Sequence, residues 1–174
     1  MYERYYKFSG DPFRLLPDPE ICLLHASCAH AWSYLQYAVK RGEGIVVVSG
    51  VPGSGKTTLA ERLLQDISGA QTVGVRLVAH SAEPSVVLRN LAHAFGLEID
   101  RLDDTQLEFG LERYLIDLAH SNRRALVIVD EAHTLSSESL EVLRLLTDLQ
   151  SHSMPVMQLF LLGDEELAMM LRAP

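Results

Sequence analysis

One run of small and charged residues could bind the phosphates of a nucleotide. It has the spacing G-x-x-x-x-G-K-T and consists of Gly50, Val51, Pro52, Gly53, Ser54, Gly55, Lys56 and Thr57. Glycines let the backbone approach phosphates closely, and the amides that follow them can form a cradle. Lys56 would place a positive charge beside the β and γ phosphates, and Thr57 would offer its hydroxyl to Mg²⁺. The pattern therefore predicts that residues 50–57, with Thr58, bind ATP and Mg²⁺.

An acidic pair follows another apolar stretch of the sequence. Residues 125–129 have the pattern of a buried strand, and Asp130 and Glu131 come directly after them. Ligands of parallel sheets bind at the carboxyl ends of the strands. We therefore expect Asp130 to hold Mg²⁺ with Thr57, and Glu131 to orient and deprotonate the attacking water. Such a pair can also serve only as a turn or helix cap, but the upstream loop favours catalysis, with Lys56 and Glu131 as the catalytic residues.

A third polar position follows the last predicted strand, at 156–162. A polar side chain that senses the γ phosphate is expected there, and the sequence has Gly163 and Asp164. A carboxylate beside a triphosphate is repelled unless it is turned away, protonated or bound to the metal. We therefore expect Asp164 to be the N-cap of the helix that follows.

The spacing of apolar residues predicts the elements that position these groups. Strands are expected at 45–48, 72–78, 125–129 and 156–162, and helices at 26–41, 56–66, 84–95, 104–120, 137–150 and 165–172. Strands that alternate with helices indicate a parallel sheet flanked by helices, which is a three-layer α/β fold. The β-branched run at 45–48 lacks alternation, so we expect it to be buried on both faces.

Composition limits the class of protein. The 174 residues suit one domain, in which a leader and helix at 1–44 would pack on a core at 45–174. No stretch approaches the length of a membrane-spanning helix, and the N-terminus lacks a secretory signal, so we expect a cytoplasmic protein. The net charge of −8 makes nucleic acid an improbable partner. The basic pairs Lys40–Arg41 and Arg123–Arg124 are expected to flank solvated helix ends.

Two further clusters can be interpreted as packing. The first, with ligand types typical of zinc sites, consists of Cys22, His25, Cys28 and His30. Its members are too close together for the separated pairs of a structural zinc site, so we expect ordinary packing. The second consists of Trp32, Tyr34 and Tyr37, and core packing is the default expectation there too.

The sequence resembles the AAA+ ATPases of the general secretion pathway A (ExeA-like) type and the related ATPases of exosortase systems. The resemblance spans essentially the whole chain. It rests on residues 1–6, 11–13 and 17–19 of the leader, on Tyr37, on residues 42–44 and the strand into the phosphate loop, and on residues 143–146, 161–163 and 166–167.

This resemblance implies a P-loop ATPase core that assembles into homo-oligomers in the full-length protein. It implies work with protein components of a secretion, pilus or envelope-export system, at the inner face of the bacterial inner membrane. It also implies that the leader packs by the adenine, with Phe13 and Pro17 as candidates.

The sequence departs from the family at several positions. Asp164 replaces a Gln and Asp148 replaces an Asn, which affects the expected sensor. The chain stops at Pro174, before the family's fifth strand, arginine finger and helical lid, and Arg172 does not match the finger. We therefore expect a fragment of a longer protein, weak hydrolysis by the chain alone, and a loop-bearing strand near an open sheet edge.

Two alternative functions share the loop and the acidic pair. One is a DNA-transaction ATPase of the transposition type, against which the net charge of −8 argues. The other is a nucleotide-dependent interaction module with little turnover, which the carboxylate at the sensor position favours.

Overall fold

A computed structural model describes residues 26–67, 71–79, 83–99, 102–151 and 154–171. The predicted roles of Phe13 and Pro17, the rest of the leader motif and Arg172 lie outside these residues. Cys22 and His25 of the possible metal cluster also lie outside them.

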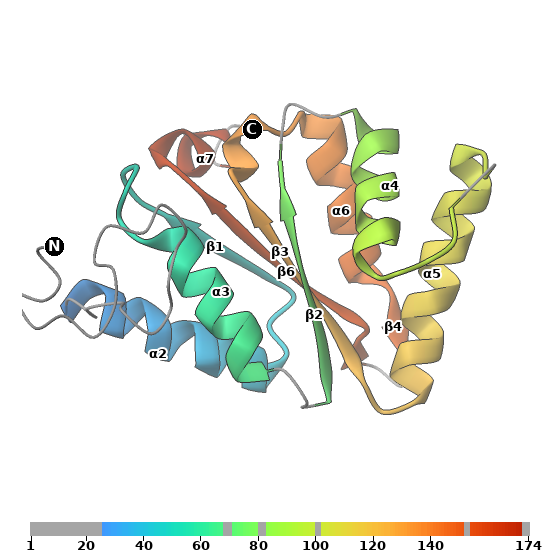
Figure 1. Cartoon of the computed structure of the whole chain (residues 1–174), viewed down its shortest axis with the longest axis horizontal. Coiled ribbons are helices and arrows are strands. Elements are labelled where there is room, and N and C mark those ends of the chain that lie inside the picture. The colour runs from blue at the N-terminus through green and yellow to red at the C-terminus, as the bar shows by residue number, and fades with distance from the viewer. Residues whose placement is uncertain (1–25, 68–70, 80–82, 100–101, 152–153, 172–174) are drawn as a thin grey trace, which may run out of the picture.

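Four parallel strands form the sheet, as the sequence predicted. They are β1 (Ile45–Ser49), β2 (Thr72–Val78), β3 (Arg124–Asp130) and β6 (Met157–Gly163), in the order β1-β6-β3-β2 (Figure 1). The register pairs Ser49 with Gly163 and Val78 with Asp130. All four carboxyl ends therefore meet at one edge, from which the loop and the acidic pair emerge.

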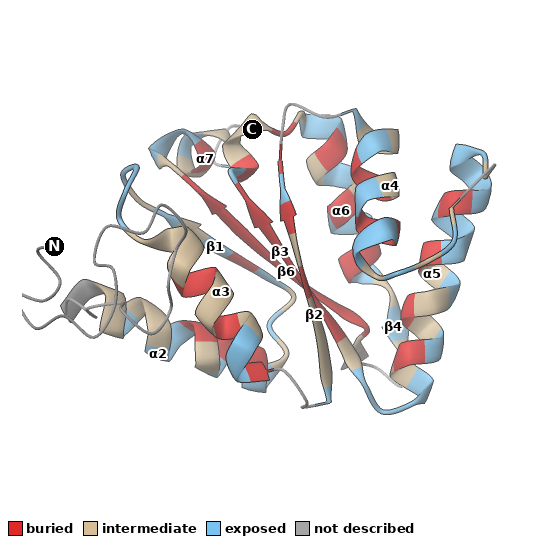
Figure 2. Cartoon of the chain, viewed as in Figure 1, coloured by how far each residue is buried: buried red, intermediate tan, exposed pale blue. Residues whose placement is uncertain are grey.

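Helices cover both faces of the sheet. The first face carries α2 (Ala26–Arg41) and α3 (Lys56–Ile67), and the second carries α4 (Pro84–Ala94), α5 (Asp104–His120) and α6 (Ser137–Asp148) (Figure 1). Because side chains alternate along a strand, Leu126 and Ile128 join the core under α2 and α3, whereas Val127 and Val129 join the core under the other helices. The central strands β3 and β6 are buried along almost their whole length (Figure 2).

Most element bounds agree with the predictions to within two residues. Helix α6 ends at Asp148 rather than at the predicted position 150, because β4 (Gln150–Ser151) pairs antiparallel with β5 (Met154–Pro155). The sequence analysis did not predict this hairpin or the 3₁₀ turn η1 (Ala132–Thr134). The last helix, α7 (Glu165–Met170), contacts β1 and η1. No helix in the described ranges is both long and apolar enough to span a membrane.

The expectation that β1 is buried on both faces was wrong. Val46 is 4% exposed, but Ile45 and Val47 on the opposite face are 43% and 42% exposed. Within the described residues β1 pairs only with β6, so it is an edge strand. The loop-bearing strand therefore lies at an open edge, as expected, but the helices of the second face do not cover it.

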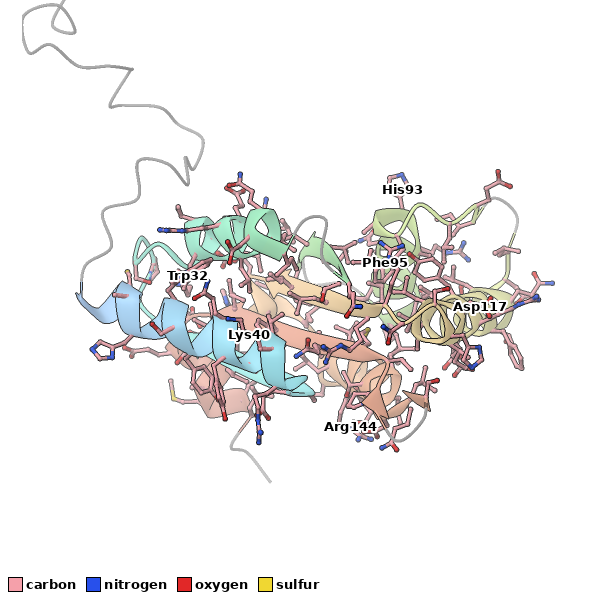
Figure 3. The ribbon with its side chains drawn as sticks, turned by 90° about the horizontal axis from the view of Figure 1, so that it is seen from below. Trp32, Lys40, His93, Phe95, Asp117 and Arg144 are labelled. Atoms are coloured by element: carbon pink, nitrogen blue, oxygen red, sulfur yellow. The ribbon has the colours of Figure 1, made fainter. Side chains whose placement is uncertain are left out.

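The aromatic residues of α2 divide between core and surface. Trp32 packs against the core under α2 and α3, as predicted, and the guanidinium of Arg62 lies 4.9 Å from its ring centroid (Figure 3). Tyr34 and Tyr37 are more than half exposed, so core packing was the wrong expectation for them. The buried stripe of the helix runs through Leu35 and Ala38, which turns both tyrosines outward.

Two glycines provide a matched test of the packing between β2 and α3. A Cβ at Gly74 would lie 2.5 Å from Leu64 Cδ2 and 2.8 Å from Ile67 Cδ1, whereas a Cβ at Gly110 in α5 would meet no atom within 4 Å. We expect Gly74→Ala to lower the free energy of unfolding by about 1–3 kcal/mol through overpacking. Gly110→Ala should raise it by about 0.5–1 kcal/mol, because alanine favours the helix. Urea denaturation measures both, and a Gly74→Ala variant as stable as the wild type would show that this contact is loose.

Candidate functional site

The loop at residues 50–55 joins β1 to α3 at the carboxyl edge of the sheet. Gly53 and Gly55 have φ angles of +78° and +86°, which side chains rarely adopt. A Cβ at either position would meet nothing within 4 Å, so the backbone conformation rather than space requires glycine. The amide of Leu59 donates to the carbonyl of Gly55 at 2.9 Å, which begins the helix directly after the loop. The helix N-terminus therefore opens at the loop, as phosphate binding requires.

Lys56 folds back over the loop. Its Nζ donates to the carbonyl oxygens of Gly50 at 2.7 Å and of Val51 at 3.1 Å. The ammonium group is thus held beside the loop by neutral acceptors. Phosphate oxygens are charged acceptors, which form stronger hydrogen bonds with an ammonium group than carbonyls do.

The other predicted loop residues lie around this backbone. Val51, Pro52, Gly53 and Ser54 are exposed, and Thr58 is half-buried in the first turn of α3. The amide of Ser54 donates to the carbonyl of Val51 at 3.2 Å. Beside the loop lies a cavity of about 160 Å³, whose lining includes Cys28, Ala31, Gly50, Ser54 and Leu59. The start of α2 thus forms one wall next to the phosphate loop.

Thr57 and Asp130 meet although they are 73 residues apart. Thr57 Oγ1 donates to Asp130 Oδ2 at 2.8 Å. Asp130 is 3% exposed, and its Oδ1 accepts from the amide of Glu131 at 3.1 Å. A hydroxyl and a carboxylate are oxygen ligands of the kind that Mg²⁺ prefers. This donor set fits the predicted metal site, and magnesium would take one or two protein ligands and its remaining oxygens from phosphate and water.

Arg76 is a site residue that the sequence analysis missed. Its Nη1 lies 3.1 Å from Asp130 Oδ2, the same oxygen that Thr57 contacts, and its Nη2 lies 3.4 Å from Glu61 Oε1. The sequence does contain a signal that could have indicated this role, because Arg76 is the one charged residue in the strand predicted at 72–78. The guanidinium compensates the charge of the buried carboxylate.

Glu131 lies at the turn between β3 and η1. Its φ of 56° and ψ of 35° place it in the left-handed region, which is uncommon outside glycine. Its side chain is 51% exposed, so the carboxylate faces solvent at the sheet edge. Such conformations are often found at functional sites, where the surrounding structure holds them.

His133 and Asp164 complete this edge. Nε2 of His133 lies 3.6 Å from Glu131 Oε2 and 3.6 Å from Asp164 Oδ2. Asp164 is the N-cap of α7, as expected, and its Oδ1 accepts from the amide of Glu166 at 2.9 Å. No role was predicted for His133, because residues 133 and 164 are far apart in the sequence and only the fold brings them together.

Asp148, one of the positions at which the sequence departs from the family, lies away from this edge. Asp148 is exposed and accepts from Arg144 at 2.7 Å at the end of α6. Arg144 also pairs with Glu141, which lowers the pKa of that carboxyl.

Cys28 and His30 are the two members of the possible metal cluster that the structure describes. Within the described part of the chain, no group of three His, Cys, Asp or Glu side chains could hold a metal ion.

Comparisons with known proteins agree with this geometry. Residues 39–171 match the family described as AAA domain. A General secretion pathway protein A of Aeromonas hydrophila is 34% identical over 179 aligned positions, which cover 100% of this chain and 32% of that protein. This chain thus spans about a third of the length of that relative.

Solved structures with less than 25% identity show the same fold. The Cdc6p protein of Pyrobaculum aerophilum superposes with a TM-score of 0.67 at 17% identity, covering 99% of this chain and 45% of that one. The ORC2 protein of Aeropyrum pernix, in ADPNP–ADP complexes, gives 0.62 at 18%, covering 92% and 46%. The ORC1 protein of Aeropyrum pernix, in complex with DNA, gives 0.56 at 20%, covering 86% and 40%. With the loop, the acidic pair and the parallel sheet in place, the chain belongs to the AAA domain family that its resemblance predicted.

Proposed function

We propose that this chain binds Mg-ATP at the loop of residues 50–57 and hydrolyses it. The observation that carries the proposal is the 2.8 Å hydrogen bond from Thr57 to Asp130, at the foot of a glycine-rich loop. It brings a hydroxyl and a buried carboxylate to the position where the loop turns into a helix. Phosphate-binding loops use this combination to hold magnesium beside the phosphates.

Each side chain then has a distinct part. Lys56 binds the β and γ phosphates, with the amides of the loop and of Thr58 in the first turn of α3. Thr57 and Asp130 hold Mg²⁺, which neutralises charge on the phosphates when bound. Glu131, exposed and in a constrained backbone conformation, orients the attacking water and accepts its proton.

The wider role is proposed from the named relative. A General secretion pathway protein A spans the whole of this chain at 34% identity, so we assign the ATPase to a secretion or envelope-export system. Its protein components would be the partners, with a homo-oligomer as the working form at the cytoplasmic side of the inner membrane. One of the solved structures is a complex with DNA, but the net charge of −8 favours a protein partner over nucleic acid.

Substitution of the loop lysine tests nucleotide binding. Lys56→Ala should weaken ATP binding about 10- to 100-fold, because a charge-assisted contact of about 1.5–3 kcal/mol is lost. Lys40→Ala is the matched control, since Lys40 is an exposed lysine in the last turn of α2. Isothermal titration calorimetry measures both affinities. Equal ATP affinity in Lys56→Ala and wild type would refute the proposed site.

Substitution of the acidic pair's second member tests catalysis separately from binding. Glu131→Gln should lower ATP turnover about 10²- to 10⁴-fold, because an amide cannot accept the proton of the attacking water. ATP affinity should stay within a few-fold of wild type. Glu138→Gln, on the exposed first turn of α6, is the control. Unchanged phosphate release by Glu131→Gln would exclude the assigned base.

Arg76 allows a test of the metal side of the site. Arg76→Met should lower the free energy of unfolding without magnesium by about 1.5–3 kcal/mol, because buried Asp130 loses a charged donor. Magnesium with a non-hydrolysable ATP analogue should stabilise this variant more than wild type, since no guanidinium competes for Asp130 Oδ2. Urea denaturation with and without these ligands measures the difference, and Arg123→Met on an exposed turn is the control. Equal stabilisation of both proteins would exclude competition between Arg76 and the metal.

A further inference from the structure

The imidazole of His133 lies between two carboxylates at the sheet edge. Its Nε2 is 3.6 Å from Glu131 Oε2 and 3.6 Å from Asp164 Oδ2, and its side chain is 18% exposed. A distance of 3.6 Å is too long for a hydrogen bond. Nε2 therefore faces two carboxylates without forming a hydrogen bond to either.

The other ring nitrogen indicates where the proton lies. Nδ1 of His133 is buried and has no hydrogen-bond partner among the described residues. A buried N–H without an acceptor is rarer in proteins than an acceptor without a donor. The two carboxylates near Nε2 also attract a proton to that side. The geometry therefore places an N–H on Nε2, pointing into the space between Glu131 and Asp164.

Asp164 occupies the position at which a sensor of the terminal phosphate was expected, but it cannot donate. An ionised carboxylate only accepts hydrogen bonds, and so does a terminal phosphate. Its Oδ1 is already occupied by the amide of Glu166, and its Oδ2 faces His133. A further donor to the phosphate at this end of β6, besides Lys56 and the loop amides, would have to come from a neighbouring side chain.

We propose that the Nε2–H of His133 supplies this donor to the terminal phosphate of bound ATP, and that Asp164 is a positioning residue for the ring. This inference rests on the proposed nucleotide site. Asp164 is adjacent to Gly163, whose carbonyl accepts from the amide of Gly50, the first residue of the phosphate loop, at 3.2 Å. The imidazole, Asp164 and the loop are therefore tied to the same end of β6.

The backbone and the side chain of His133 have separable roles. Its amide nitrogen lies 3.4 Å from the position that a Cβ of Gly163 would take, so the main chain of η1 packs closely on β6. Replacing the ring should therefore leave the fold intact, which thermal denaturation can verify.

Affinities for two nucleotides test the proposal. Titration calorimetry with magnesium compares ADP, which lacks the terminal phosphate, with a non-hydrolysable ATP analogue. His133→Ala should weaken binding of the analogue about tenfold, equivalent to one hydrogen bond to a charged group, and leave ADP affinity within twofold. His133→Gln retains an N–H donor and should recover part of the loss.

Asp164→Asn provides a rescue experiment. The substitution places an amide donor at residue 164, beside the space that the imidazole would leave. The double variant His133→Ala, Asp164→Asn should therefore bind the analogue more tightly than His133→Ala alone. Equal losses for ADP and the analogue in His133→Ala would assign the ring a structural role and overturn the proposal. Unchanged affinity for both would overturn it as well.

NMR tests the position of the ring proton without nucleotide and its response to nucleotide. In ¹⁵N-histidine spectra, the signal that disappears in His133→Gln should show a proton on Nε2, and it should shift with the ATP analogue but not with ADP. A ring protonated at Nδ1 would contradict the inference. Failure of wild type to bind either nucleotide would instead refute the proposed function, which Lys56→Ala tests separately.

Discussion

The hydrogen bond between Thr57 and Asp130 depends on the whole sheet. Thr57 follows β1 and Asp130 ends β3, and these strands are not neighbours because β6 lies between them. Only a parallel order with aligned carboxyl ends brings the two oxygens to 2.8 Å. A shift of one residue in either ladder would also exchange the faces of the side chains. The buried core and the contact between Thr57 and Asp130 are therefore fixed by the same register.

Donors within the protein compensate negative charge at the carboxyl edge of the sheet. Three carboxylates gather there, from Asp130, Glu131 and Asp164. Arg76 compensates the buried Asp130, while Lys56 donates to loop carbonyls. On the proposed function, a nucleotide would replace these internal contacts, which reduces the net free-energy gain from each new contact. The affinity for a nucleotide would therefore depend on how much stronger the hydrogen bonds to phosphate are than the internal hydrogen bonds, rather than on the number of contacts.

The sequence predicted the features that depend on local spacing. The loop, the parallel sheet, the N-cap role of Asp164 and most element bounds follow from glycine positions, apolar periodicity and capping chemistry. The exposure of Ile45 and Val47 could not be predicted, because burial depends on which helix reaches an edge strand. The roles of Arg76 and His133 were also hidden. Arg76 contacts a residue 54 positions away, and His133 lies 3.6 Å from Asp164 because the strands that precede them, β3 and β6, are paired in the sheet. Such pairings are set by tertiary packing, which periodicity does not encode.

Gly163 shows how the loop and the sensor position are coupled. A Cβ there would lie 2.8 Å from Leu167 Cδ2 and 2.9 Å from Leu167 Cβ, so the missing side chain lets α7 pack directly on the end of β6. Leu167 is fully buried in this contact. The same glycine accepts the amide of Gly50 from the loop. A movement of α7 would therefore shift Asp164 and the start of the loop at Gly50 together.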